Sequence, residues 1–399
     1  MQAHTPISDA LAKRNALVLT LAMALGGSSP AIVVSLGGLV GQNLAENKEL
    51  ATLPVSLFNL GLALGTIPAA MIMRRIGRRL GYILGAGIGV TGGCLAAFGI
   101  ASWSFVLFCF GALIVGMYGS FNQSYRFAAT DAASESFKPR AIAWVMTGGL
   151  AAGIIGPQTI IWFRDAIQTA PFAGAFLGQA VLALMSMVVV SFLRPAPVSV
   201  AQKAGGRPLS QIVRQPRFIV AVVAGLVSYG LMSFLMTAAP LAMIGCGHSV
   251  GAAALGIQWH ILAMYGPSFF TGRLIGRFGK LPVTATGLIL IGLSAAIGLS
   301  GIEIAHFWAT LILLGIGWNF GFIGATAMVT DCYRPEERTK VQAANDFLVF
   351  GSTAIASFSS GKLLNTGGWD SVNWLVFPPV AIALVLLVWQ QRSKAVVPA

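Results

Sequence analysis

Charged residues are rare in this sequence. Asp, Glu, Lys and Arg together make up 9% of its 399 residues, whereas hydrophobic residues make up 56%. Soluble proteins average about 25% charged residues, so this composition could not cover a globule with a water-compatible surface. The shortage excludes a soluble enzyme, a disordered protein, a collagen and a disulfide scaffold. It predicts a polytopic membrane protein, whose helices tolerate the 48 glycines and 18 prolines better than soluble helices do.

Cysteine is scarce as well, and the usual metal and nucleotide motifs are missing. The four cysteines show no C-x-x-C spacing, so neither a metal site nor a disulfide framework is expected. The chain has no G-K-S or G-K-T phosphate-binding loop, so ATP is not expected to drive it directly. We expect no cofactor and no metal. The cysteines are Cys94, Cys109, Cys246 and Cys332.

Twelve apolar segments are long enough to cross a bilayer, which takes about 20 residues. The longest connection is rich in Pro and Gly, which is typical of a linker. It divides the chain into an N-terminal six-helix bundle over residues 1–193, a cytoplasmic linker over 194–217 and a C-terminal six-helix bundle over 218–399. The expected spans cover residues 15–42, 50–73, 80–101, 103–125, 141–163, 172–193, 218–243, 251–272, 281–301, 305–330, 341–363 and 372–391.

The basic residues divide unevenly between the two ends of these spans. With the N-terminus in the cytoplasm, 22 of the 25 Lys and Arg residues fall on the cytoplasmic side, and Lys48, Arg164 and Lys362 fall outside. Positive charge collects on the cytoplasmic side of membrane proteins. We therefore expect a multi-pass protein of the cytoplasmic (inner) membrane with both termini inside. The net charge of +13 is interpreted as orientation and not as a nucleic-acid-binding face.

The two halves carry an internal repeat. R-I-G-R at residues 75–78 aligns with R-F-G-K at 277–280 at an offset of 202 residues. T-D at 130–131 aligns with T-D at 330–331 at an offset of 200 residues, and Arg140 and Lys340 fit that second offset. Three matches in nearly one register indicate a duplication. Parallel six-helix halves are a recognised plan of membrane transporters.

With these features the chain resembles the major facilitator superfamily over nearly its whole length. In that family the loop after the second span carries G-x-x-x-D-R-x-G-R-R. In the first half Arg74 occupies the acidic position of this pattern, and in the second half Gly276 does. The resemblance implies an all-α membrane protein with twelve transmembrane helices in two pseudo-symmetric six-helix bundles. The residues that fit the pattern are Arg75, Gly77, Arg78 and Arg79 in the first half and Gly272, Arg277 and Gly279 in the second.

The missing loop carboxylate suggests a substitute at the gate. We hypothesise that Asp346, early in the span 341–363, pairs with Arg75 or Arg78 when the cytoplasmic gate is shut; the alternative is a solvated acid near a helix N-terminus. Two further acids occupy equivalent places in the repeats, and each is expected to pair with a loop arginine of its own half: Asp131 with Arg78, and Asp331 with Arg277. The candidate gate residues are thus Arg75, Gly77, Arg78, Asp131, Arg277, Asp331 and Asp346.

The span 141–163 resembles the glycine-and-GP pattern of the superfamily's antiporters. Gly149, Gly153, Gly156 and Pro157 fit it and are candidate hinge residues, because small residues let helices approach closely and Pro loosens a helix. Simple close packing is the alternative. The span 103–125 lacks the embedded arginine often found in proton-driven exporters, so the direction of transport stays open.

In the superfamily, the first, fourth, seventh and tenth spans line the central cavity. The polar residues of these spans are uncharged, which suits a neutral or weakly polar solute that contains a ring. Ionisable groups inside spans are functional candidates by default, so His260 and Asp346 are candidates for proton coupling; a histidine bonded to a neighbouring helix is the alternative. The candidate substrate residues are Ser28, Ser29, Asn122, Gln123, Tyr229, Gln258, Trp259, His260, Trp318 and Asn319.

The leading hypothesis is a secondary transporter that moves a metabolite, vitamin or drug by rocker-switch alternating access, with protons as a candidate coupling ion. A multidrug-type proton antiporter is the alternative. A polytopic membrane enzyme or a non-transporting receptor is less favoured, because the sequence shows no cluster of catalytic residue types with ligand spacing. The expected partners are a small-molecule substrate and the lipid bilayer, and the expected state is a monomer.

Overall fold

The computed structural model describes residues 9–131, 133–134, 137–194 and 206–395, and within these ranges all regular structure is helical. Both chain ends and residues 195–205 of the predicted linker lie outside the described residues. The helices are α1 Ala10–Gly26, α2 Ser29–Leu44, η1 Lys48–Leu50, α3 Leu53–Ala101, α4 Phe105–Gln123, α5 Tyr125–Ala128, α6 Lys138–Phe163, α7 Ala173–Ser191, α8 Leu209–Val213, α9 Pro216–Gly245, α10 Val250–Tyr265, α11 Ser268–Phe278, α12 Lys280–Ser300, α13 Ile304–Val329, η2 Thr330–Cys332, η3 Pro335–Glu337, α14 Arg338–Trp374 and α15 Phe377–Ala395.

The all-α membrane fold expected from the sequence is confirmed. Nine stretches are long and apolar enough to cross a membrane within the described part of the chain. Two of them, of 54 and 53 residues, are double spans interrupted at Gly77 and Gly368, where the backbone leaves helical geometry. The eighth expected span is broken into α10 and α11 around Gly266 and Pro267, which is why no single long helix represents it.

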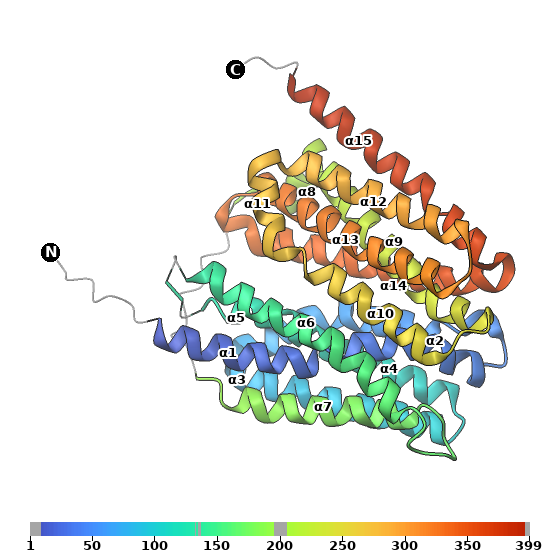
Figure 1. Ribbon diagram of the computed structural model, residues 1–399. Coiled ribbons are helices and arrows are strands. Elements are labelled where there is room, and N and C mark those ends of the chain that lie inside the picture. Colours follow the sequence, from blue (N-terminus) through green and yellow to red (C-terminus); the bar gives the residue numbers. More distant parts are fainter. Residues whose placement is uncertain (1–8, 132, 135–136, 195–205, 396–399) are drawn as a thin grey trace. The chain divides into compact units, whose positions relative to one another are not determined.

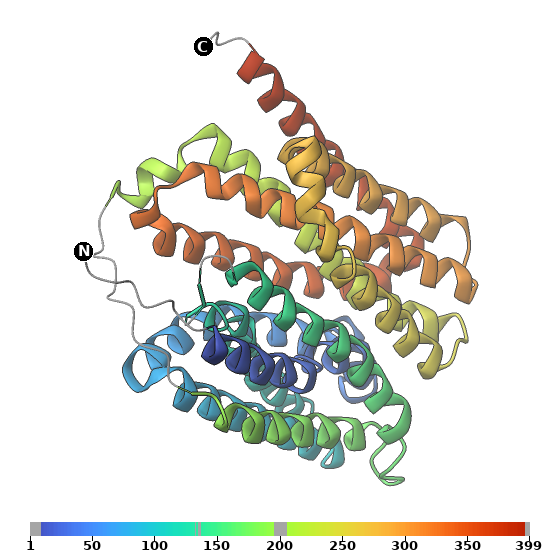
Figure 2. The same ribbon diagram turned by 60° about the vertical axis from the view of Figure 1, so that its left-hand side comes forward.

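The described residues form two compact units. The first contains the residues up to Val33 and those from Gly61 to Arg194, and the second contains Val34–Leu60 and the residues from Gly206 onward. In the first unit α1 packs against α6 and α7, beside which it lies in Figure 1. In the second unit α13 is central and packs against α9, α10 and α12, while α14 packs against α9; Figure 2 shows these helices from another side.

A buried polar cluster fastens Val34–Leu60 within the second unit. The Asn59 side chain, at the start of α3, donates from Nδ2 to Ser357 Oγ at 2.8 Å. Ser357 Oγ in turn lies 2.8 Å from Ser233 Oγ on α9. Nearby, a Cβ on Gly361 would lie 2.1 Å from Thr52 Oγ1, so only glycine allows this approach. The segment is therefore bound to α9 and α14 by specific contacts.

The turns after the second and eighth spans have the same backbone conformation. Gly77 has φ 82° and ψ 164°, and Gly279, its partner in the repeat, has φ 90° and ψ 164°. This region is essentially restricted to glycine, because a Cβ would clash with the backbone. The repeat that was read from R-I-G-R and R-F-G-K is thus a repeat of local structure.

Gly206 and Arg207, just before α8, are clamped onto the connection between α13 and α14. The fully buried Glu337 carboxylate accepts hydrogen bonds from the backbone N, Nε and Nη2 of Arg207 at 2.7, 2.9 and 2.8 Å. It also accepts from the backbone N of Arg334 at 2.9 Å. Gly206 has φ 83°, and a Cβ there would lie 2.4 Å from Glu337 Cγ. The Arg207 guanidinium holds the pKa of Glu337 well below its ordinary value, although burial alone would raise it.

We predict that Gly77→Ala lowers the free energy of unfolding by about 1–3 kcal/mol, the usual cost of a strained backbone conformation. A Cβ at Gly77 would meet no atom within 4 Å, so the loss measures the backbone alone. Unfolding in mixed micelles checks it, with Gly87→Ala as the control. Gly87 lies in the same helix with equal space around it, and this change is expected to be neutral or slightly stabilising. Equal losses in both variants would contradict the backbone explanation.

We also predict that Glu337→Gln lowers the melting temperature at pH 7 and that this loss narrows as the pH falls below the ordinary carboxyl range. The pKa of Glu337 is lower in the folded protein than in the unfolded chain. Its contribution is therefore fully present above the unfolded pKa and is lost as the pH falls toward the folded pKa. Melting curves from about pH 2.5 to pH 7.5 measure this. The exposed neighbour Glu336 supplies the control Glu336→Gln, whose curve should stay parallel to that of the native protein.

Candidate functional site

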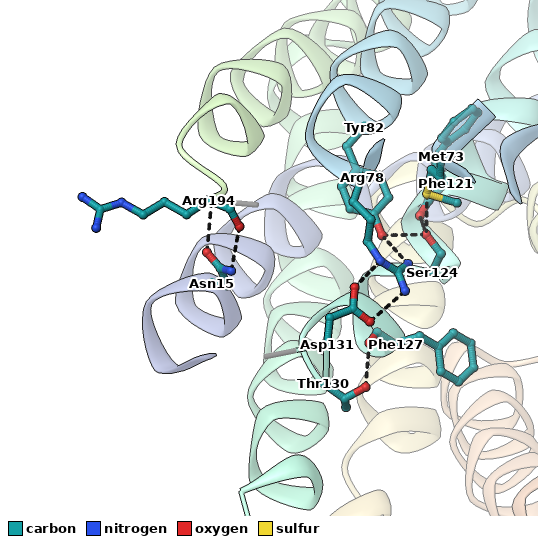
Figure 3. Close-up of polar contacts among 10 residues, drawn as sticks. All are labelled: Asn15, Met73, Arg78, Tyr82, Phe121, Ser124, Phe127, Thr130, Asp131 and Arg194. Carbon is teal, nitrogen blue, oxygen red and sulfur yellow. Dashed lines mark hydrogen bonds and ion pairs between the residues drawn. The ribbon is translucent and has the colours of Figure 1, made fainter. Parts of the chain in front are cut away.

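An ion pair joins the turn after the second span to the connection after the fourth span in the first unit, as Figure 3 shows. Arg78, directly after the Gly77 turn, bonds both carboxylate oxygens of Asp131 through Nε and Nη2, the latter at 2.9 Å from Oδ1. Arg78 Nη1 also donates to the Tyr82 hydroxyl at 3.4 Å, and that hydroxyl lies 2.9 Å from Ser124 Oγ. The expected pairing of Arg78 with Asp131 is confirmed, and the network of Tyr82 and Ser124 extends it.

The second unit repeats this pair with a different cation. Lys280 Nζ donates to Asp331 Oδ1 at 2.6 Å. Arg277, the partner expected from the sequence, is exposed and lies over the ring of Phe278, 5.2 Å from its centroid. The physical reason is the turn: in both repeats the residue that directly follows the glycine faces the acid. The alignment that pairs Gly77 with Gly279 already pairs Arg78 with Lys280, so the sequence contained this signal.

Five aromatic side chains gather in the second unit; we call Tyr229, Tyr265, Trp318, Phe322 and Phe350 the aromatic cluster. Trp318 and Phe322 are stacked, with centroids 5.3 Å apart and an interplanar angle of 20°. Tyr229 meets Trp318, Phe322 and Phe350 edge-on at 5.4, 4.9 and 5.7 Å, and Tyr265 lies 6.2 Å from Trp318.

The aromatic cluster contains a buried N–H donor and several partly exposed aromatic rings, two features that suit a ring-shaped ligand. Trp318 is 6% exposed, and its Nε1–H has no acceptor among the described residues. Tyr229, Tyr265 and Phe322 are half-buried. Of the expected substrate residues, Tyr229 and Trp318 are thus brought together. Phe350 was not foreseen, because it comes from α14, which carries no cavity signal in the sequence.

Asn319 and His260 are both bonded between helices. Asn319 Nδ2 donates to Met264 O and Ser268 Oγ at 2.6 and 2.7 Å, so it binds α13 to the break between α10 and α11. His260 is fully buried, with Nδ1 2.7 Å from Leu311 O. Because a carbonyl only accepts, Nδ1 must carry the hydrogen. Nε2 has no partner among the described residues and remains an acceptor in the neutral ring.

In the first unit the expected substrate residues lie close to helix breaks. Ser28 and Ser29 are buried at the junction of α1 and α2, and Ser29 Oγ accepts from Gln179 Nε2 at 3.1 Å. Asn122 is 5% exposed and Gln123 is half-buried at the end of α4. These residues belong to a different unit from the aromatic cluster, so each group is described separately.

The candidate hinge lies where α6 approaches the junction of α1 and α2. Gly149, Gly153, Gly156 and Pro157 are all buried. A Cβ on Gly156 would lie 2.8 Å from Ala31 Cβ and 2.9 Å from Ser28 O. The glycine pattern therefore produces close helix packing at Gly156, and its role as a hinge stays a prediction.

The remaining candidates are dispersed. Arg75 is exposed, Trp259 is 42% exposed and Gln258 is half-buried. Asp346 is half-buried and accepts from Asn345 Nδ2 at 3.2 Å. Its hypothetical pairing with Arg75 or Arg78 stays a prediction. Among the described residues no group of three or more His, Cys, Asp or Glu side chains is placed to hold a metal ion.

Comparison with known proteins gives one family and several relatives. The Major Facilitator Superfamily model matches residues 15–267 and 247–399. The chain is 60% identical to the riboflavin transporter RfnT of Brucella anthropi, over 96% of this chain and 97% of that protein. It is 30% identical to the uncharacterized MFS-type transporter YdeG of Bacillus subtilis, over 96% of this chain and 93% of that protein. It is 29% identical to YddS of the same organism, likewise an uncharacterized MFS-type transporter, over 94% and 91%.

The two ion pairs are expected to differ in strength. Double-mutant cycles should give about 0.2–1 kcal/mol for Lys280 and Asp331, whose side chains are 32% and 41% exposed and joined by one bond. The coupling of Arg78 and Asp131 should be larger, because a two-pronged, charge-assisted contact is stronger than a single one. The variants are Arg78→Gln with Asp131→Asn, and Lys280→Gln with Asp331→Asn, measured by unfolding in mixed micelles. A weaker coupling for Arg78 and Asp131 would refute the ranking.

Proposed function

Because this chain belongs to the Major Facilitator Superfamily of membrane transporters, we propose that it carries riboflavin across the cytoplasmic membrane by alternating access. It is a transporter and not an enzyme, as its family and its relatives establish. In this proposal the basic ends of the spans, and with them both termini, lie in the cytoplasm, because Lys and Arg divide unevenly between the two ends of the spans.

The observation that carries the proposal is the aromatic cluster. Riboflavin has an uncharged, planar, three-ring system with carbonyl oxygens on one edge. Trp318, Phe322 and Tyr229 offer aromatic faces and edges to such a ring, and an aromatic pair contributes about 0.5–1.5 kcal/mol beyond the area that it buries. The buried Trp318 Nε1–H, which has no acceptor among the described residues, is a donor for a ring carbonyl. The 60% identity with the transporter RfnT supports the same substrate.

The shortage of charge in the spans supports a neutral solute. A charged substrate inside the membrane must be paired, because an unpaired buried charge is very costly. The expected substrate residues at the junction of α1 and α2 and on α4, α9 and α13 are serines, amides and aromatics. They supply hydrogen bonds for the sugar-alcohol chain of riboflavin without fixed charge. A neutral, ring-containing vitamin was one of the solutes that the sequence suggested.

In the proposed mechanism the two six-helix halves expected from the sequence, residues 1–193 and 218–399, rock about the bound solute. The pairs Arg78–Asp131 and Lys280–Asp331 hold the ends of the spans within each unit. The same proposal includes pairing of Asp346 with a loop arginine, a hinge at the closely packed Gly156, and proton transfer at His260 or Asp346. A proton antiporter that exports neutral drugs is the second candidate, favoured by the glycine-and-GP pattern of α6.

Saturable riboflavin flux in proteoliposomes tests the function. We expect Trp318→Ala to weaken riboflavin binding at least tenfold, which corresponds to about 1.4 kcal/mol. Trp318→Phe keeps a stacking ring but removes the N–H, so its affinity for riboflavin should lie between those of the native protein and Trp318→Ala. The matched control is Trp374→Ala, because Trp374 is 64% exposed and is neither in the aromatic cluster nor among the expected substrate residues. Equal losses at both tryptophans, in variants that fold normally, would argue against the aromatic cluster as the site.

The same vesicles separate the remaining alternatives. A pH gradient that accelerates flux several-fold supports proton coupling, whereas an unchanged rate removes coupling and leaves facilitated transport. Movement of neutral drugs without saturable riboflavin flux would favour the multidrug antiporter.

A further inference from the structure

A small pocket in the second unit is not explained by transport. Its volume is about 230 Å³, which is below the roughly 300–1,000 Å³ of sites that enclose drug-sized ligands. It lies where the beginnings of α9 and α12 meet the end of α13 and the last turns of α15. We call it the basic pocket. Its lining residues are Arg217, Gly279, Lys280, Leu281, Pro282, Met328, Asp331 and Gln390.

The basic pocket has a net positive charge. Lys280 is paired with Asp331 at 2.6 Å. Arg217 makes no ion pair within the described part of the chain, so one cation is left over. The first turn of α12 forms part of the wall. Its unpaired backbone N–H groups and the positive end of its dipole favour an anion as well.

Gln390 indicates that the basic pocket holds a polar ligand. Its side chain is 6% exposed, and Oε1 has no hydrogen-bond donor among the described residues. A buried polar atom without a partner costs about 1–3 kcal/mol, so such atoms are rare in native structures. Because Gln390 lines the pocket, a ligand that brings a hydroxyl donor would remove this cost. A ligand that fits both features combines an anion with a hydroxyl group.

The helix α15, which supplies Gln390 to the basic pocket, also has an exposed apolar face. Ile382, Val385 and Trp389 recur at helical spacing and are 59%, 67% and 51% exposed. In a membrane protein such a face contacts acyl chains. One helix thus combines a lipid-facing apolar surface with a buried amide in a cationic pocket, and these features match the acyl chains and the headgroup of a phospholipid.

We propose that the basic pocket binds the headgroup of an anionic phospholipid. Arg217 and Lys280 hold the phosphodiester, and a headgroup hydroxyl donates to Gln390 Oε1, as the glycerol of phosphatidylglycerol can. Basic pockets between transmembrane helices are known to take anionic headgroups. The bound phosphate competes with Asp331 for Lys280, so the lipid loosens the Lys280–Asp331 pair. This assignment does not depend on the transported substrate.

Native mass spectrometry of the purified full-length protein tests the proposal. The protein is released from mixed micelles that contain phosphatidylglycerol and phosphatidylcholine in equal amounts, and the retained lipids are counted. We expect phosphatidylglycerol to be retained at least fivefold over phosphatidylcholine. Arg217→Gln and Gln390→Leu should each abolish this preference. The control is Arg214→Gln, because Arg214 is exposed and near in sequence but does not line the pocket.

Three outcomes would overturn the proposal. Equal retention of the two lipids would exclude a headgroup site. Equal losses in Arg214→Gln and Arg217→Gln would indicate general surface charge instead of a pocket. Inorganic phosphate that raises the melting temperature as much as phosphatidylglycerol does, and displaces it, would identify a soluble phosphate as the occupant. Gln390→Leu keeps all charges, so it gives a result even if Arg217→Gln fails to fold.

Discussion

The bilayer offers no water to a charge or to an unpaired backbone group, and the rest of this structure depends on that constraint. Backbone groups must be satisfied inside each segment, so the spans are helical. Charges must leave the spans or find partners, so they gather at helix ends. There three carboxylates are each held by a cation: Asp131 by Arg78, Asp331 by Lys280 and Glu337 by Arg207. The absence of water in the bilayer thus explains both why charged residues are rare in the spans and why these carboxylates are paired with cations.

The duplication shows which parts of these helix ends are interchangeable. The glycine conformation is kept in both halves, because φ values of 82° and 90° leave no other residue type. The cation that follows it is free to change from arginine to lysine, since a turn and an acid suffice to place a positive charge. The aromatic cluster, by contrast, joins α9, α10, α13 and α14 of the second unit. The glycine turns therefore belong to the scaffold that the two halves share, whereas the aromatic cluster lies in the second unit.

Hydropathy and charge predicted most of the fold, because both report directly on the membrane. The apolar runs located the spans, and the repeated R-x-G motif located equivalent turns. Three features escaped this reasoning. The break between α10 and α11 depends on Gly266 and Pro267 within an apolar run that looks continuous. The Arg207–Glu337 clamp joins residues 130 positions apart. Phe350 enters the aromatic cluster through packing of α14 on α9. Such contacts arise from tertiary packing, which periodicity does not encode.

Stacking and charge recognition are separated in the second unit, and this separation bears on what each place can bind. The three cation–ring contacts among the described residues involve Phe137, Phe127 and Phe278, all outside the aromatic cluster. A planar neutral ring therefore gains contact with the cluster while giving up little hydration. A phosphorylated ring would have to shed the water of its phosphate without a cation to replace it. The basic pocket has the cations that the cluster lacks, and it lies at helix ends, where an anion keeps part of its water. The two proposals, a neutral solute in the interior and a phosphate at the surface, thus rest on the same distribution of charge.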